Sequence, residues 1–159
     1  MAEVVELEIP ARPEFLGLAR LLVAAAAAHD PLFPEDRIDD LRLSVSEACT
    51  NAIEAQARTD EDEGDAPVED ADIIHIRCLL ETERVEVEIT DHGGGFDPGA
   101  LVPHPPAGDP ARLDFERGLG IPLIRILTDE VEFRPLPHGT SVRMVLHALP
   151  PPRPGRQPS

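Results

Sequence analysis

Hydrophobic and polar residues alternate over five short segments of the chain. The first, which reads VVELEI from residue 4, has the period of a half-buried β-strand. Two segments in the middle flank a short Glu-Thr turn, and the last two flank Pro-His-Gly at 137–139, so each pair predicts a hairpin. The strands predicted by this pattern cover 4–10, 73–80, 84–90, 131–136 and 140–149.

Apolar residues at steps of three and four predict helices between these strands. From residue 34 to about 58, one face carries Ile38, Leu41, Val45, Ala48 and Ala52, the spacing of a helix that buries one side. Shorter helices are expected over 14–28 and about 120–129, the latter with a proline in its tolerant first turn. The order of elements predicts an α+β fold, a two-layer sandwich with the helices on one face of a mixed, largely antiparallel sheet.

Three stretches carry neither pattern. Residues 60–72 are expected to form a loop, in which eight of thirteen residues are acidic, and 91–117 form a Gly- and Pro-rich connection. A long irregular connection inside a compact domain is usually functional or disordered, and a Pro-rich segment such as 150–159 is typical of disorder. We therefore expect one domain over 1–149, followed by a disordered tail over 150–159.

The charge of the chain excludes several classes of function. The 159 residues include 31 Asp and Glu against 14 Lys and Arg, a net charge of −17, and all 14 basic residues are Arg. Nucleic-acid binding needs clustered positive charge and aromatic stacking surface, so no nucleic acid is expected as a partner. The absence of lysine excludes P-loop and Schiff-base chemistry.

Neither a membrane span nor a zinc site is expected. No apolar run reaches the ~18 residues that a span needs, so we expect a soluble, cytoplasmic protein without a membrane partner. Cys49 and Cys78 lie far apart inside apolar segments, which favours buried thiols in a reducing compartment. Four scattered histidines, His75, His104, His138 and His147, match no zinc spacing.

Four local motifs could carry chemistry. Glu47 and Asn51 lie one helical turn apart, away from the apolar stripe, where a carboxylate could accept a proton and an amide oxygen could bind Mg²⁺. Asp91 ends a predicted strand just before three glycines, which let a ligand approach the backbone closely. A Gly-x-Gly at 118–120 opens a helix, whose free N–H groups favour phosphates. A Gly-Thr pair at 139–140 begins the last strand. Taken singly, each motif is also typical of a solvated helix face, a helix start or a turn.

In this order along the chain, the four motifs resemble the N, G1, G2 and G3 boxes of the Bergerat-fold (GHKL) ATPases. The segments SEACTNAIE, DHGGGF, RGLGIPLIRIL and GTSVRM are similar to those of the RsbW-like anti-sigma-factor serine/threonine kinases of bacteria, and the likeness covers roughly 5–148. The resemblance implies a kinase that uses Mg-ATP to phosphorylate an anti-anti-sigma (STAS-type) protein and thereby regulates a sigma factor by partner switching. The resemblance does not decide whether the protein forms a homodimer.

The same resemblance implies a role for individual residues. Glu47 would be the general base for a serine hydroxyl, and Asn51 would hold the Mg²⁺. Asp91 would accept a hydrogen bond from the adenine amine, and Thr140 would close the far side of that pocket. An ATP lid is implied over about 97–117. The other nucleotide-binding positions implied are Gly93, Gly95, Phe96, Arg117, Gly118, Leu119 and Gly120.

Three features depart from the family's pattern. Ala55 and Gln56 stand where His or His-Gly is frequent, the acidic loop 60–72 is longer than usual, and His92 replaces an Asn- or Asp-like residue. The first two support an alternative, an ATP-binding module that sequesters a partner without significant kinase activity. The ATPase half of a histidine kinase is disfavoured, because too few residues precede Glu47 for a helical dimerisation domain.

Overall fold

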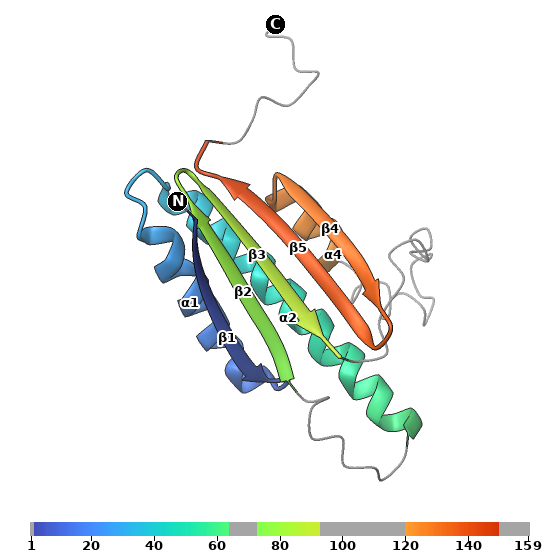
Figure 1. Ribbon diagram of the computed structural model, residues 1–159. Coiled ribbons are helices and arrows are strands. Elements are labelled where there is room, and N and C mark those ends of the chain that lie inside the picture. The colour runs from blue at the N-terminus through green and yellow to red at the C-terminus, as the bar shows by residue number, and fades with distance from the viewer. Residues whose placement is uncertain (1, 64–72, 93–119, 150–159) are drawn as a thin grey trace, which may run out of the picture.

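The computed structural model describes residues 2–63, 73–92 and 120–149, which form two layers (Figure 1). One layer is a five-stranded sheet with the strand order β1-β2-β3-β5-β4, and helices cover one of its faces. The α+β sandwich is therefore confirmed. The strands are β1 (Glu3–Pro10), β2 (Ile73–Glu81), β3 (Arg84–Asp91), β4 (Glu130–Leu136) and β5 (Gly139–His147).

All four strand pairings in this sheet are antiparallel. The expectation of a mixed sheet was wrong for the described strands. Tight hairpins join β2 to β3 and β4 to β5, and a tight hairpin can only make an antiparallel pair. A parallel pair needs a crossover, usually one helix, that carries the chain back to the end where the first strand began. Between β1 and β2 the chain instead passes through two helices.

The second layer contains α1 (Leu16–Ala28), α2 (Glu35–Glu63) and α4 (Gly120–Leu127), with a 3-10 turn η1 (Pro13–Phe15) before α1. α2 continues past its predicted end near 58, so residues 60–63 are helical instead of part of a loop, because no glycine or proline interrupts the sequence from Glu35 to Glu63. α4 ends two residues early because the Asp129 N–H already donates to Val145 O of the sheet (2.9 Å). None of the helices in the described ranges is long and apolar enough to cross a membrane.

The core lies between the helices and the inner face of the sheet. Alternate residues of β3 face it, ending with Asp91, and the predicted apolar stripe of α2 is buried, with no member more than 5% exposed. Both cysteines are free and fully buried. Burial raises the pKa of Cys49 to about 12 and that of Cys78 to about 11, so both are unreactive thiols, as predicted.

The outer face of the sheet is charged. Glu86 of β3 accepts hydrogen bonds from Arg143 of β5 (2.8 and 2.9 Å) and from Arg84 (2.9 Å). The bonds from Arg143, and after them those from Arg84, hold the pKa of Glu86 below its usual value. Cross-strand pairs of this kind stabilise a sheet, and their charges suit a face that no helix covers in the described residues.

Arg37 joins three elements at one end of the molecule. Its guanidinium donates to Asp129 Oδ2 (2.6 Å), to His147 O at the end of β5 (3.1 Å) and to Leu127 O at the end of α4 (3.5 Å). Asp129 Oδ2 also accepts from the His147 N–H (2.7 Å). The Arg37 and Asp129 side chains are each only 10% exposed, so this is a largely buried ion pair.

A second tie at the same end runs through Glu83 in the β2–β3 turn. Glu83 has the left-handed backbone φ of 57°, which costs a non-glycine residue about 1–2 kcal/mol. In this conformation its N–H donates to Asp30 Oδ2 (2.7 Å), and its carbonyl accepts from the Ala148 N–H (2.8 Å). The loop after α1, the β2–β3 turn and the end of β5 are therefore linked through one residue.

We predict that Asp129→Asn strongly destabilises the fold, because it leaves the largely buried Arg37 with only the more exposed Asp40 as a charged partner (3.2 Å). Removing one member of a buried ion pair costs about 3–5 kcal/mol, measured as a fall in the free energy of unfolding in urea. The matched control is Asp39→Asn. Asp39 pairs with Arg42, and the two side chains are 61% and 42% exposed, respectively. An exposed pair contributes about 0–1 kcal/mol. Equal losses of unfolding free energy in the two variants would therefore contradict a structural role for the Arg37–Asp129 ion pair.

Candidate functional site

Glu47 and Asn51 converge on the first residue of α4. Both are partly exposed on α2, and a Cβ atom built on Gly120 would lie 2.7 Å from Glu47 Oε2 and 3.4 Å from both Asn51 Oδ1 and Nδ2. Only a residue without a side chain allows this approach without displacing the carboxylate. The structure thus brings together three of the predicted site residues, Glu47, Asn51 and Gly120.

The position of Gly120 gives this cluster its electrostatic character. The first N–H groups of a helix have no partner within the helix and attract negatively charged oxygens. Gly120 is the first residue of α4, so this positive end lies beside an amide oxygen and a carboxylate. An amide oxygen, free N–H groups and a carboxylate together suit a phosphate chain with a hard cation and a proton acceptor.

Asp91 and Thr140 form a second cluster at the ends of neighbouring strands. They are register partners, Asp91 as the last residue of β3 and Thr140 near the start of β5, and they are only 5% and 4% exposed. Both belong to the strand faces that point toward the helices. α2 packs against β3 and β5, and the arrowhead of β3 and the start of β5 lie toward the C-terminal half of α2 (Figure 1).

Gly139 makes the second cluster sterically possible. Its φ is +114°, and a Cβ atom at this position would lie 1.9 Å from the carbonyl oxygen of Asp91. The backbone of the β4–β5 turn therefore packs directly on the end of β3, and no other residue type could occupy this position without moving Asp91.

Thr140 leaves one buried polar atom available to a ligand. Its Oγ1 is buried, and no hydrogen-bond partner is found for it in the described part of the chain. Buried hydroxyl groups are almost always hydrogen-bonded in native structures, so an orphaned one beside a buried carboxylate indicates where a polar ligand would bind. A hydroxyl group next to a carboxylate fits an adenine, whose amine can donate a hydrogen bond to Asp91.

The remaining implied positions lie outside the described residues. They are Gly93, Gly95, Phe96, Arg117, Gly118 and Leu119, together with the proposed lid over 97–117 and the tail over 150–159. Within the described residues, no group of three or more His, Cys, Asp or Glu could hold a metal ion.

Ala55 and Gln56, which depart from the family's pattern, are both buried. Gln56 Nε2 makes a long hydrogen bond to Ile73 O (3.5 Å) at the start of β2, and its Oε1 has no hydrogen-bond partner within the described ranges. Gln56 is therefore partly engaged in holding α2 to the sheet.

Two features of the site were not predicted from sequence. The close approach of Gly120 to Glu47 joins residues in separate motifs, and the Arg37 cluster that fixes the far end of α4 joins residues about ninety positions apart. No local signal marks either contact, because each depends on how α2 and α4 pack. Gly120 itself was the available clue to the first contact, since a side chain there would collide with Glu47.

The chain is similar to known proteins over most of its length. A family model for the histidine kinase-like ATPase domain matches residues 9–146. The chain is 36% identical to the serine-protein kinase RsbW of Bacillus pumilus over 135 residues, which is 82% of this chain and 77% of that protein. It is 34% identical to RsbW of Bacillus subtilis over 134 residues, 82% and 77% of the two chains. For RsbW of Listeria monocytogenes the identity is 32% over 136 residues, 83% and 80% of the two chains.

Three glycine-to-alanine variants test the packing of the site. Gly139→Ala is expected to lower the free energy of unfolding by at least about 1–3 kcal/mol, the usual cost of a strained backbone, because its methyl group would also overlap the Asp91 backbone. Gly120→Ala should change stability little, because the Glu47 carboxylate that it meets can move aside. Gly17→Ala, in open space on α1, is the control and should gain up to about 1 kcal/mol. Urea unfolding measures all three, and a Gly139→Ala protein as stable as the control would refute the close contact.

Proposed function

Because this chain belongs to the histidine kinase-like ATPase domain family, and within it to the group of RsbW serine-protein kinases, we propose that it is an ATP-dependent protein serine kinase that regulates a sigma factor by partner switching. The observation that carries the proposal is the convergence of Glu47 and Asn51 on the N-terminus of α4 at Gly120. It joins a proton acceptor, a metal ligand and a phosphate-binding helix end in one place.

The nucleotide would span the two clusters. Asp91 would accept a hydrogen bond from the adenine amine, and the buried Thr140 hydroxyl would complete the polar wall of the same pocket. At the other end, the N–H groups of α4 would meet the phosphates. Asn51 would hold Mg²⁺, which neutralises charge on the phosphate oxygens when it is bound.

Glu47 would act as the general base of the transfer. The serine oxygen of the substrate protein forms a bond to the γ-phosphorus as the bond to the ADP oxygen breaks, and Glu47 takes the hydroxyl proton. Asn51 lies one helical turn further along α2, so metal binding and proton acceptance occupy adjacent positions on one rigid element. This arrangement aligns the reacting groups without a lysine.

The phosphate acceptor that we propose is an anti-anti-sigma protein of the STAS type, with a sigma factor as the second partner. The kinase would alternate between them in the cytoplasm, and the same likeness makes a homodimer an expectation. Nucleic acid is not a proposed partner, because a net charge of −17 repels a phosphate backbone.

One observation favours a second function, a module that binds ATP and sequesters a partner without transferring phosphate. Ala55 and Gln56 stand where relatives often carry His or His-Gly, and both are buried on α2, the helix that also carries Glu47. A changed packing there could misplace the base while leaving the nucleotide site intact. The two functions differ in phosphoryl transfer alone, so kinetics distinguish them.

We predict that Asp91→Asn weakens ATP binding at least tenfold. The amide cannot accept with the same charge-assisted strength, and such hydrogen bonds contribute about 1.5–3 kcal/mol. Calorimetric titration with Mg-ATP measures the dissociation constant, and urea unfolding confirms that the variant folds. Asp39→Asn, on the exposed side of α2, is the matched control. Equal affinities for Asp91→Asn and the control would remove Asp91 from the nucleotide site.

Glu47→Gln and Asn51→Ala should fail in different ways. Glu47→Gln keeps the shape beside Gly120 but cannot take the proton, so phosphoryl transfer should fall by about 10²–10⁴-fold with ATP affinity nearly unchanged. Asn51→Ala removes a metal ligand and should weaken Mg-ATP binding itself.

The assay is transfer of labelled phosphate from ATP to a serine of a candidate antagonist, with Glu88→Gln on the outer face of the sheet as the control. Wild-type protein that binds ATP and a sigma factor but phosphorylates no antagonist would favour the sequestering module instead.

A further inference from the structure

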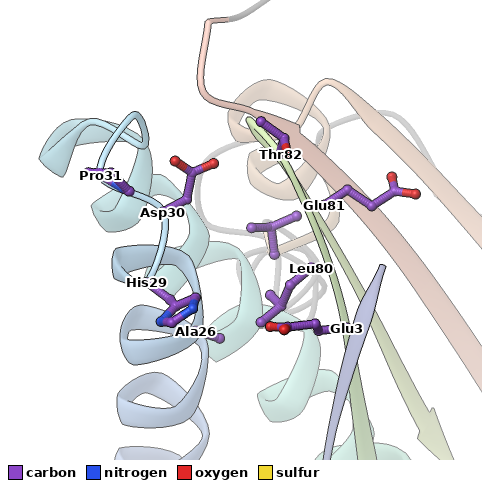
Figure 2. Close-up of a pocket in the computed structure, with 9 residues that line it drawn as sticks. Glu3, Ala26, His29, Asp30, Pro31, Leu80, Glu81 and Thr82 are labelled. Atoms are coloured by element: carbon purple, nitrogen blue, oxygen red, sulfur yellow. The ribbon is translucent and has the colours of Figure 1, made fainter. Parts of the chain in front are cut away.

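A groove lies at the end of the molecule opposite the candidate site. It consists of two adjoining hollows of about 250 and 310 Å³ between the C-terminal half of α1 and the β1–β2 edge of the sheet. The two hollows share Glu3, Ala26, His29 and Leu80, and Figure 2 shows these side chains around the opening of the first. The function proposed above uses none of these residues.

The groove has an apolar floor and an acidic rim. Ala26 and Leu80 lie on the floor, joined by Leu22 and Val5 in the second hollow. Glu3, Asp30 and Glu81 line the first hollow, and of these Glu81 is already paired with Arg84 (2.7 Å). Asp30 accepts backbone hydrogen bonds from Glu83 and Leu32, which hold its pKa below the usual value, so it stays charged. Such a groove suits an apolar segment that carries positive charge.

The chain leaves β5 directly beside this rim. Ala148 donates to Glu83 O (2.8 Å), and Glu83 donates to Asp30 Oδ2 (2.7 Å). One residue therefore separates the end of the described C-terminal strand from a carboxylate that lines the groove. Whatever follows Leu149 starts within a short distance of the opening.

The sequence that follows has the matching chemistry. Residues 150–159 contain five prolines, Arg153, Arg156 and no acidic residue, in a chain whose net charge is −17. In an extended polyproline conformation ten residues reach about 31 Å. Crossing from β5 over β3 and β2 to β1 takes about 15 Å, three steps of the usual strand spacing, so the length is sufficient.

We propose that the groove is the binding surface for the chain's own segment 150–159. Its prolines pack on Ala26 and Leu80, and its two arginines pair with the carboxylates of Glu3 and Asp30. A tethered segment has an effective concentration in the millimolar range, and prolines reduce the entropy lost on ordering. Weak individual contacts are therefore enough to keep the segment bound. The inference is independent of the kinase activity.

Paramagnetic labelling of the full-length chain tests the proposal. A nitroxide is attached at Ser159→Cys, where the label is selective because Cys49 and Cys78 are buried. The expected result is that the signals of Ala26, His29 and Leu80 lose most of their intensity, while those around Gly139, at the opposite end of the sheet, do not. Double substitution of Arg153→Gln and Arg156→Gln, or high salt, should restore the signals.

The matched control replaces two exposed arginines outside the groove, Arg42 and Arg134, with glutamine, and it should leave the signal loss unchanged. Two results with the labelled chain alone would overturn the proposal: no signal loss in the groove, or signal loss that persists in the Arg153/Arg156 variant. A third would be signal loss that appears only between molecules, when nitroxide-labelled chains are mixed with unlabelled, isotopically enriched chains. The last of these would assign the groove to a second copy of the chain. No nucleotide is present in the experiment, so its outcome does not depend on the proposed kinase function.

Discussion

The largely buried ion pair between Arg37 and Asp129 sets the geometry on which the candidate site depends. Arg37 lies in the first turn of α2 and holds the C-terminal end of α4 through Leu127 O and Asp129. From Arg37 to Glu47, α2 rises about 15 Å, and α4 measures about 11 Å from Leu127 back to Gly120. Because the two helices run in opposite directions, fixing one end of α4 at Arg37 brings its other end to Glu47 and Asn51. A structural contact at one end thus positions the candidate site at the other.

The two ends of the molecule differ in how well their polar groups are satisfied. At the Arg37 end, the backbone groups of Glu83, Asp129, His147 and Ala148 all make hydrogen bonds across elements. At the other end, two buried oxygens, Thr140 Oγ1 and Gln56 Oε1, lack partners within the described chain. Unsatisfied buried polar atoms destabilise a fold, so their presence at one end is consistent with a protein that gains hydrogen bonds there when it binds a ligand.

The strong acidity of the chain has different consequences for long-range and for short-range electrostatic interactions. A net charge of −17 repels a nucleoside triphosphate at a distance. Salt screens this repulsion beyond about 8 Å under physiological conditions. A bound nucleotide would therefore depend on local groups, for which the end of α4 and the Asn51 amide are the candidates. On the outer face of the sheet, Arg84 and Arg143 pair with Glu86, which lowers the repulsion among the carboxylates.

Local sequence determined most of the elements and supplied the candidates for the site. Strand alternation and the Ile38-to-Ala52 stripe depend only on the period of each backbone conformation, so they could be read without the fold. The end of α2 and the absence of a parallel strand pair could not, because helix ends and strand neighbours depend on competition with the rest of the chain. The motifs that carry Glu47, Asn51, Asp91 and Thr140 were visible in the sequence. Only the tertiary structure placed Gly120 against Glu47 and Gly139 against Asp91, because these contacts join segments far apart in the chain and arise from helix and strand packing.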